Sequence, residues 1–369
     1  MNQLFRWDQT GLFLLALAAG ILPFAVPEVC AAALREGLTL CSGPLLLSLF
    51  PFLVVSRLLV QCPESDLLAL PFRLAAWGIG IRTPCAARVL CIGFLGGFAP
   101  AASAAAQAVR TGQLTAEEAG ALLPACICSG PSFVVLTVGQ SLLGSAELGV
   151  LLFASQITAN YLTAALLNRF AGVRSVKPGS AAPASPAPPR LDEILADAAL
   201  TYCKLCGFIL FFRMLAAGAG ALLPAGAGTL CSILLEVCSG CDLASRTGRW
   251  GSLLCCAALS VQGLSVLLQV RTICPPEMTL RPLYRSRLLH LPLSLALFYL
   301  LLPGGEADVF STLPARVLLM RRVPPDCALL VFAVCCMAAC TLRSGIRQVE
   351  QKQMARNAGG CCINSKTLL

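Results

Sequence analysis

The chain has 369 residues, of which 57% are hydrophobic and only 12% are charged, and its mean hydropathy is +0.80. Soluble domains carry about 25% charged residues, so this composition excludes an ordinary soluble domain and favours a protein of the lipid bilayer. The formal net charge of +9 comes from arginines at the ends of apolar runs, as is typical of membrane flanks. No basic stripe is interleaved with aromatic residues, which argues against nucleic-acid binding.

Apolar runs predict a series of helices in the first half of the chain. About 20 apolar residues span the hydrocarbon of a bilayer, and such spans are expected at 10–26, 43–61 and 146–168. The stretch 28–41 is typical of an amphipathic helix at the membrane interface. The shorter stretch 67–81 suits a tilted or re-entrant segment.

Two further runs of the first half are interrupted midway. The run 89–109 contains Gly96-Gly97 and Pro100, and the run 115–140 contains Ser129-Gly130-Pro131-Ser132. A break inside the bilayer frees backbone groups that lipid cannot satisfy, so it must be buried in protein or line a cavity. Paired broken helices therefore indicate the binding site of a transporter.

The second half follows a linker at 171–190 that is rich in Pro, Ala and Ser, a composition typical of a solvated, semi-rigid segment. The segments expected after it are an apolar run to about residue 223, a helix at 229–240, a polar hairpin at 242–249, a second broken helix at 251–270, a basic loop at 271–287, spans at 288–302 and 324–342, and a basic tail.

The two halves match in the order of their segments, which is the pattern of an inverted repeat. We predict an all-α polytopic membrane protein with two inverted repeats and broken or re-entrant helices; chance agreement in a chain rich in Gly and Ala is the alternative. Ser129-Gly130 and Gln262-Gly263 should then lie within one helix length, ~30 Å for 20 residues. The predicted units are an N-terminal membrane helix at 1–27, a first repeat at 28–170, a linker at 171–191, a second repeat at 192–303, a C-terminal loop and membrane helix at 304–342, and a basic tail at 343–369.

The breaks lie within motifs that recur in a known family. In chain order the motifs are Glu36-Gly37-Leu38, Leu49-Phe50-Pro51-Phe52, Gly96-Gly97-Phe98-Ala99-Pro100, Ser129-Gly130-Pro131-Ser132-Phe133, Leu235-Glu236-Val237-x-Ser-Gly and Ser260-x-x-Gly263-Leu264-Ser265-Val266-x-x-Gln269. Over about residues 28–302 this order resembles the sporulation integral membrane proteins of the YlbJ type, which carry the nucleoside-recognition (Gate) domain. The resemblance implies an architecture like that of concentrative nucleoside transporters. It also implies a role in spore formation, moving dipicolinate into the forespore across its mother-cell-derived outer membrane.

The chain departs from the family pattern at two of these breaks. Members usually show Gly-Tyr-Pro with a basic residue nearby, whereas this chain has Phe98-Ala99-Pro100 and no nearby Lys. The usual Asn-Pro of the first broken helix is here Gly130-Pro131. These changes remove polar ligands, so the identity of the solute stays open.

We expect a solute to bind at the breaks. Ser and Gln side chains would supply neutral hydrogen bonds, and helix N-termini would offer partial positive charge to a carboxylate. The alternative is that the serines bond back to their own backbone. The candidate substrate-binding residues are Gly97, Ser129, Gly130, Ser132, Glu236, Ser260, Gln262, Gly263, Ser265 and Gln269.

Glu236 is the one candidate that carries a charge. An ionisable group within an apolar segment faces a cavity or a partner, so we expect it to contact the cavity between the repeats and to bind a cation or orient a neighbouring donor. The alternatives are a helix-end carboxylate at the membrane interface and a carboxylate paired with Arg213 for stability. On the first hypothesis Glu236→Gln retains folding and lowers transport.

Four arginines, Arg57, Arg73, Arg82 and Arg88, are expected to snorkel to the membrane interface, and one of them is a candidate to meet substrate carboxylates. The 21 cysteines lie mostly in apolar stretches, where Cys behaves as a small hydrophobe. We therefore expect no metal and no cofactor.

Three classes of function compete on this sequence. A transporter of a small anionic, dipicolinate-like solute is favoured, with a nucleoside-type permease as a variant. A non-transporting membrane scaffold for spore assembly is the second class. An enzyme is not expected, because no His-rich cluster, paired Asp set or Ser/His constellation is present. The expected partners are a small-molecule solute and the lipid bilayer, and homo-oligomerisation is left open.

Overall fold

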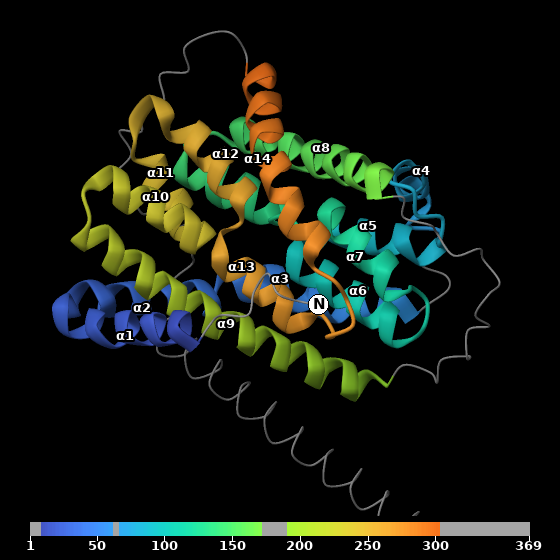
Figure 1. Ribbon diagram of the computed structural model, residues 1–369, viewed down its shortest axis with the longest axis horizontal. Coiled ribbons are helices and arrows are strands. Elements are labelled where there is room, and N and C mark those ends of the chain that lie inside the picture. Colours follow the sequence, from blue (N-terminus) through green and yellow to red (C-terminus); the bar gives the residue numbers. More distant parts are fainter. Residues whose placement is uncertain (1–8, 62–65, 172–189, 303–369) are drawn as a thin grey trace, which may run out of the picture.

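The computed structural model describes residues 9–61, 66–171 and 190–302 (Figure 1). Within these ranges every regular element is a helix, so the prediction of an all-α fold is confirmed. Four stretches are long and apolar enough to cross a membrane, namely Pro27–Leu47, Ala146–Ala171, Leu191–Leu222 and Gly248–Ile273. The chain is thus an all-α membrane protein. The span predicted at 324–342, most of the predicted linker and the basic tail lie outside the described residues.

The helices of the first half follow the predicted segments closely. Each of the two interrupted runs forms two shorter helices. The first run is divided at Gly97 and the second at the non-helical segment 127–130. In chain order the elements are α1 (Gln9–Ala25), α2 (Pro27–Ser42), α3 (Pro44–Gln61), α4 (Leu70–Gly78), α5 (Pro84–Gly96), α6 (Phe98–Arg110), α7 (Ala116–Cys126), the π-helix η2 (Ser132–Leu142) and α8 (Ala146–Ala171).

The second half departs from the predicted segments in three places. Its elements are α9 (Leu191–Leu222), α10 (Ala225–Leu235), α11 (Val237–Ser245), the 3-10 turn η3 (Gly248–Trp250), α12 (Gly251–Val261), α13 (Gly263–Ile273) and α14 (Arg281–Leu301). The helix expected to end at Ser239-Gly240 instead breaks at Glu236. The first half of the expected hairpin is the end of helix α11, and the expected basic loop is mostly helix, since α13 runs to Ile273 and α14 begins at Arg281.

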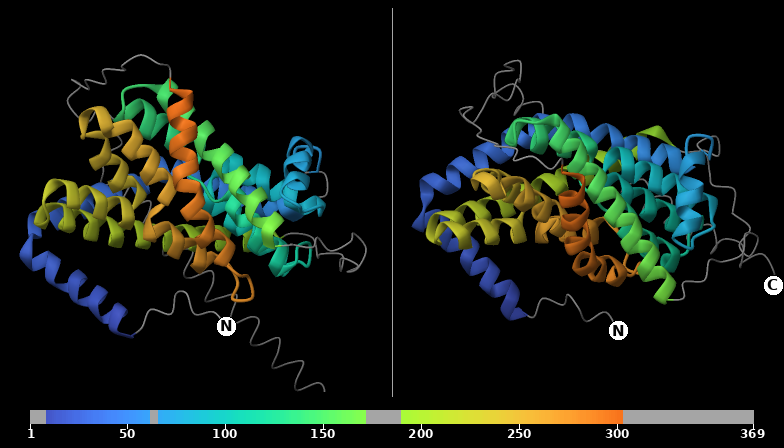
Figure 2. Two further views of the ribbon diagram at one scale, coloured as in Figure 1. Left: turned by 45° about the horizontal axis from the view of Figure 1, so that its top comes forward. Right: turned by 90° about the horizontal axis from the view of Figure 1, so that it is seen from above.

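The two halves of the chain pack into one another. Helix α9 packs along α2 and α3 of the first half, while α8 packs against α12 and α14 of the second. Figures 1 and 2 place α8 and α9, the longest described helices, on opposite sides of the helical body, with the broken helices between them. Helix α2, expected at the interface, lies against α9, where the side chain of Arg213 pairs with Glu36 at 3.0 Å.

Small residues let the broken helices approach closely, as is common in membrane bundles. The alanines of α6 are almost entirely buried, so this helix is enclosed on all sides. Helices η2 and α8 cross where Gly139 faces Gly149: a Cβ on Gly149 would lie 2.7 Å from the Cα of Val135 and 3.0 Å from that of Gly139. No side chain fits at this crossing.

Gly149→Ala should therefore destabilise the protein. The added methyl group meets backbone atoms that cannot rotate away, and overpacking of this kind costs about 1–3 kcal/mol. Thermal unfolding of the detergent-solubilised protein measures the loss. Gly207→Ala in α9 is the matched control, because nothing lies within 4 Å of its Cβ position; equal unfolding temperatures for the two variants would contradict the close crossing.

Candidate functional site

Four helix breaks lie in the interior of the bundle. Gly97 separates α5 from α6 with φ 80° and ψ −163°, a conformation that favours glycine. The segment 127–130 between α7 and η2 is not helical. Glu236 is extended between α10 and α11 (φ −151°, ψ 124°), and Gln262 is left-handed between α12 and α13 (φ 65°).

The four breaks touch one another. A Cβ on Gly97 would lie 2.6 Å from the backbone nitrogen of Gly130, and one on Gly263 would lie 3.1 Å from the backbone nitrogen of Glu236. Between the halves, the amide of Gln262 donates to the hydroxyl of Ser129 at 3.4 Å. The structure thus brings Ser129 and Gln262 into hydrogen-bonding distance, far inside the expected limit of one helix length.

A small cavity, here called the break cavity, lies where the breaks meet. Its volume is about 50 Å³, well below the ~300–1,000 Å³ of drug-sized ligand pockets, so the cavity is too small for a ligand of that size in this conformation. The first residues of α6, η2 and α11 all face it. Its lining comes from both halves of the chain: Leu45, Leu49, Gly96, Phe98, Ser129, Gly130, Ser132, Phe133, Ile209, Glu236, Val237, Cys238, Val266 and Gln269.

Half of the ten candidate residues line this cavity, namely Ser129, Gly130, Ser132, Glu236 and Gln269. Gly97 and Gly263 stand behind them and allow the backbones to approach. Gln262 and Ser265 contact the lining through side chains, because Gln262 donates to Ser129 and Ser265 accepts from Gln269 at 3.0 Å. Ser260 belongs elsewhere: its hydroxyl bonds to Gln156 and Ser294 on α8 and α14.

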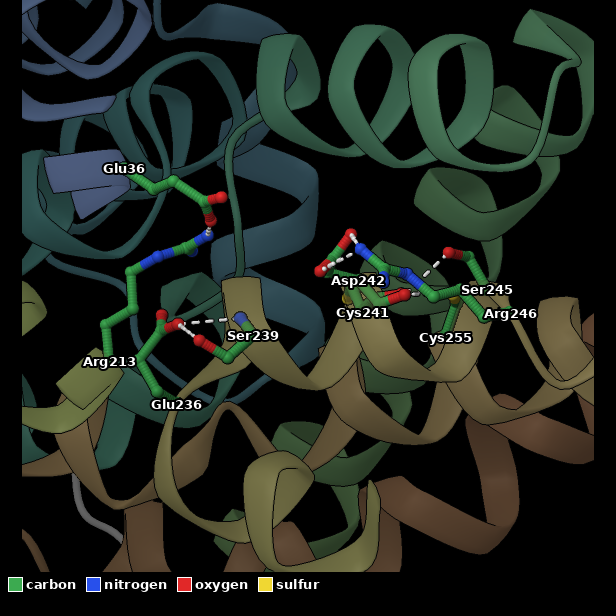
Figure 3. Close-up of polar contacts among 9 residues, drawn as sticks. All are labelled: Glu36, Arg213, Glu236, Ser239, Cys241, Asp242, Ser245, Arg246 and Cys255. Carbon is green, nitrogen blue, oxygen red and sulfur yellow. Dashed lines mark hydrogen bonds and ion pairs between the residues drawn. The ribbon is translucent and has the colours of Figure 1, made fainter. Parts of the chain in front are cut away.

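Glu236 is the N-cap of α11. Its carboxylate accepts from the backbone nitrogens of Cys238 at 2.9 Å and Ser239 at 2.7 Å, and from the Ser239 hydroxyl at 2.9 Å. The side chain is only 2% exposed. Figure 3 shows it turned toward Ser239, while Arg213 reaches toward Glu36. Glu236 therefore lines the break cavity and also caps a helix end, but this helix end is buried in the bundle rather than at the membrane interface.

Gln262 holds a conformation that L-residues rarely adopt, at a cost of about 1–3 kcal/mol. Its own amide offsets part of this cost, because it donates to the carbonyl of Leu259 at 2.6 Å and so caps the last turn of α12. Strain kept at a buried break is characteristic of functional sites.

Gln269, which lines the break cavity, has a side-chain oxygen without a hydrogen-bond partner among the described residues. The residue is 1% exposed, and this oxygen is buried. A buried carbonyl without a partner costs about 1–3 kcal/mol. The Gln269 oxygen is therefore available to accept a further hydrogen bond.

A polar cluster behind the breaks escaped the sequence analysis. Arg287, placed in a loop by sequence, is buried in α14 and donates to Asn160 at 3.0 Å and to the carbonyl of Ser260 at 3.4 Å. Asn160 in turn donates to the carbonyl of Ile127 at 3.4 Å. Within the described ranges no carboxylate forms an ion pair with Arg287. The spacing of Arg287, His290 and Ser294 on one helix face is the signal that would have found the cluster.

The arginines expected at the interface do not all lie there. Arg57 is buried and pairs with Asp197 at 2.7 Å. Arg88 pairs with Asp66 at 3.1 Å. Arg73 lies over the ring of Trp77, 6.0 Å from its centroid. The prediction of snorkelling was wrong for Arg57, because Asp197 on α9 offers a partner from a distant part of the chain.

Among the described residues, no group of three or more His, Cys, Asp or Glu side chains could hold a metal ion. No family model, curated protein or solved structure matches the chain.

Glu236→Gln should lower the free energy of unfolding by about 2 kcal/mol. The amide keeps one acceptor but turns an NH2 group toward backbone donors, and hydrogen bonds to a charged group are worth about 1.5–3 kcal/mol. The change therefore costs stability, contrary to the expectation that it is neutral for folding. Unfolding in detergent, followed by circular dichroism, measures the effect.

Glu117→Gln provides the control for this measurement. Glu117 also lies in the first turn of a helix, α7, but is exposed, so its loss affects only the helix dipole, worth at most about 1 kcal/mol. If both variants lose the same stability, the carboxylate of Glu236 does not cap α11.

Proposed function

We propose that this protein is a membrane permease that passes a small solute through the break cavity. The observation that carries the proposal is the meeting of four helix breaks from both halves of the chain around one cavity. In membrane transporters, discontinuous helices supply solute ligands near the bilayer centre, because irregular backbone is tolerated there only around a cavity. The contracted volume of the cavity suits the closed stage of such a protein.

The chemistry of the cavity supports a small polar solute. Apolar side chains such as Leu49, Phe98 and Val266 form much of the wall, and a few polar groups would fix orientation, as in most ligand sites. Gln269 is the polar group best placed for this role, because it faces the cavity and its oxygen lacks a partner.

An anionic solute is the form that we favour. The N-termini of α6 and η2 face the cavity and carry partial positive charge, whereas Glu236 neutralises that of α11. The oxygen and nitrogen of a Gln amide are assigned from the hydrogen-bond network rather than observed. If the Gln269 amide is rotated by 180°, its oxygen accepts a hydrogen bond from the Ser265 hydroxyl. Its NH2 group then points toward the cavity, where it can donate to an anion. Dipicolinate in spore formation, across the outer forespore membrane, follows from the family resemblance alone.

Uptake of labelled dipicolinate into proteoliposomes tests the proposal, with a nucleoside as the second solute and protein-free liposomes as the blank. Gln269→Leu should lower uptake about tenfold or more, since a hydrogen bond to a charged group is worth about 1.5–3 kcal/mol. It should change the unfolding temperature little, because losing the Nε2 bond to the Ser265 hydroxyl opposes the gain from removing a buried oxygen that has no partner among the described residues.

Thr163→Val is the matched control. Thr163 on α8 is buried and its Oγ1 also lacks a partner among the described residues, but it does not line the break cavity. Its loss should leave uptake unchanged. No uptake of either solute by the parent protein would support the membrane scaffold instead, and equal uptake by the two variants would remove Gln269 from the site.

A further inference from the structure

A second cavity lies next to the break cavity, and we call it the vestibule. Its volume is about 210 Å³, and α3, α6, α9 and α13 form its walls. The same four helices also contribute to the lining of the break cavity, and Gln269 lines both. The two cavities therefore share a wall, and the oxygen of the shared polar residue, Gln269, has no hydrogen-bond partner within the described ranges.

The cavities follow one another along the helices. On α13, Val266 lines the break cavity, Gln269 lines both and Ile273 lines the vestibule. Residues three and four apart share one face of a helix, and the seven residue steps from Val266 to Ile273 span about 10 Å at 1.5 Å per residue. On α9, Ile209 faces the break cavity and its neighbour Phe208 the vestibule. The two cavities therefore lie one after the other along these helices, with Gln269 between them.

The vestibule carries an excess of positive charge. The buried guanidinium of Arg57 donates to Ser103 at 3.2 Å and pairs with Asp197 at 2.7 Å, so these two charges offset each other. Arg110 and Lys204 also line the cavity and are exposed. In the part of the chain that the structure describes, neither has an ion-pair partner.

The vestibule opens where the helices leave the bundle. Arg110 is the last residue of α6 and Ile273 the last of α13, and both are followed by non-helical segments, at 111–115 and 274–280. A cleft lined by one sign of charge raises the local concentration of the opposite ion and its rate of association.

We infer that the vestibule is a capture site for a small free dianion bearing carboxylate or phosphate groups, which passes Gln269 to reach the break cavity. Arg110 and Lys204 supply the attraction, and Arg57 is held in place by Asp197 and Ser103. The inference rests on the proposed function, because it names the charge class of the solute and the side from which it arrives.

Equilibrium dialysis of dipicolinate against the purified full-length protein in neutral detergent tests the capture site. The variant is Arg110→Gln/Lys204→Gln, which spares the buried Arg57. It should bind dipicolinate about tenfold more weakly at low ionic strength and lose most of the salt dependence of the parent. The uncharged diamide of the same ring should show neither effect.

The control variant is Arg35→Gln/Arg249→Gln, which removes two exposed positive charges that line neither cavity. It should keep parental affinity. Equal affinities for the two double variants would overturn the capture site, as would a parent protein that binds no dipicolinate. Competition by phosphatidylglycerol added to the micelles, with no binding once it is present, would assign the vestibule to a lipid headgroup and overturn the solute route.

Proteoliposome uptake separates this inference from the proposed function. If the protein binds dipicolinate through Arg110 and Lys204 but takes up none, the permease proposal is wrong and the capture site stands. If Arg110→Gln/Lys204→Gln shows normal uptake at low solute concentration, the capture site is wrong and the permease proposal stands.

Discussion

The structure depends on satisfying backbone groups that the helix breaks set free. A helix end leaves up to four N–H or C=O groups without intrahelical partners, and in hydrocarbon each unsatisfied group costs several kcal/mol. In this protein, side chains form hydrogen bonds with these free backbone groups: Gln262 donates to the carbonyl of Leu259, and Asn160 donates to that of Ile127. Glu236 accepts from the first backbone nitrogens of α11.

Arg287 extends the same principle with a full charge. Its guanidinium bonds to the last turn of α12 and, through Asn160, to the break after α7. The C-terminal ends of helices carry partial negative charge, so a cation between two such ends is favoured even without a carboxylate. A fixed guanidinium thus occupies the kind of position where half-helix ends coordinate cations in transporter folds.

The sequence predicted those breaks that have a local cause. Gly97 and Gly263 both have a positive φ, of 80° and 69°, and Pro131 lacks the backbone N–H that would continue the preceding helix. Glu236 is flanked by Leu235 and Val237, with neither Gly nor Pro to mark the break, and its extended backbone lies against Gly263 of a different helix. Gly240, expected to end a helix, instead allows α11 to approach α10, because a Cβ there would lie 2.8 Å from the Cα of Ile233.

Long-range partners explain the remaining differences between sequence and structure. The start of α14 carries three arginines, and this charge suggested a loop, although Pro282 in its first turn is a helix-start signal. Arg57 and Arg287 are buried because Asp197 and Asn160 reach them from elements far along the chain. Half of the candidate site residues line the break cavity, because the helix breaks that contain them lie together. Ser260 points away from this cavity, because a sequence motif does not fix how a helix is rotated about its axis.

A cryo-electron microscopy map of the protein in lipid nanodiscs with saturating dipicolinate tests the central claim most directly. The account predicts backbone contact between Gly97 and Gly130, Ser129 beside Gln262, and solute density next to Gln269 in a widened break cavity. Continuous helices through these positions, or solute density bound only elsewhere, would contradict it.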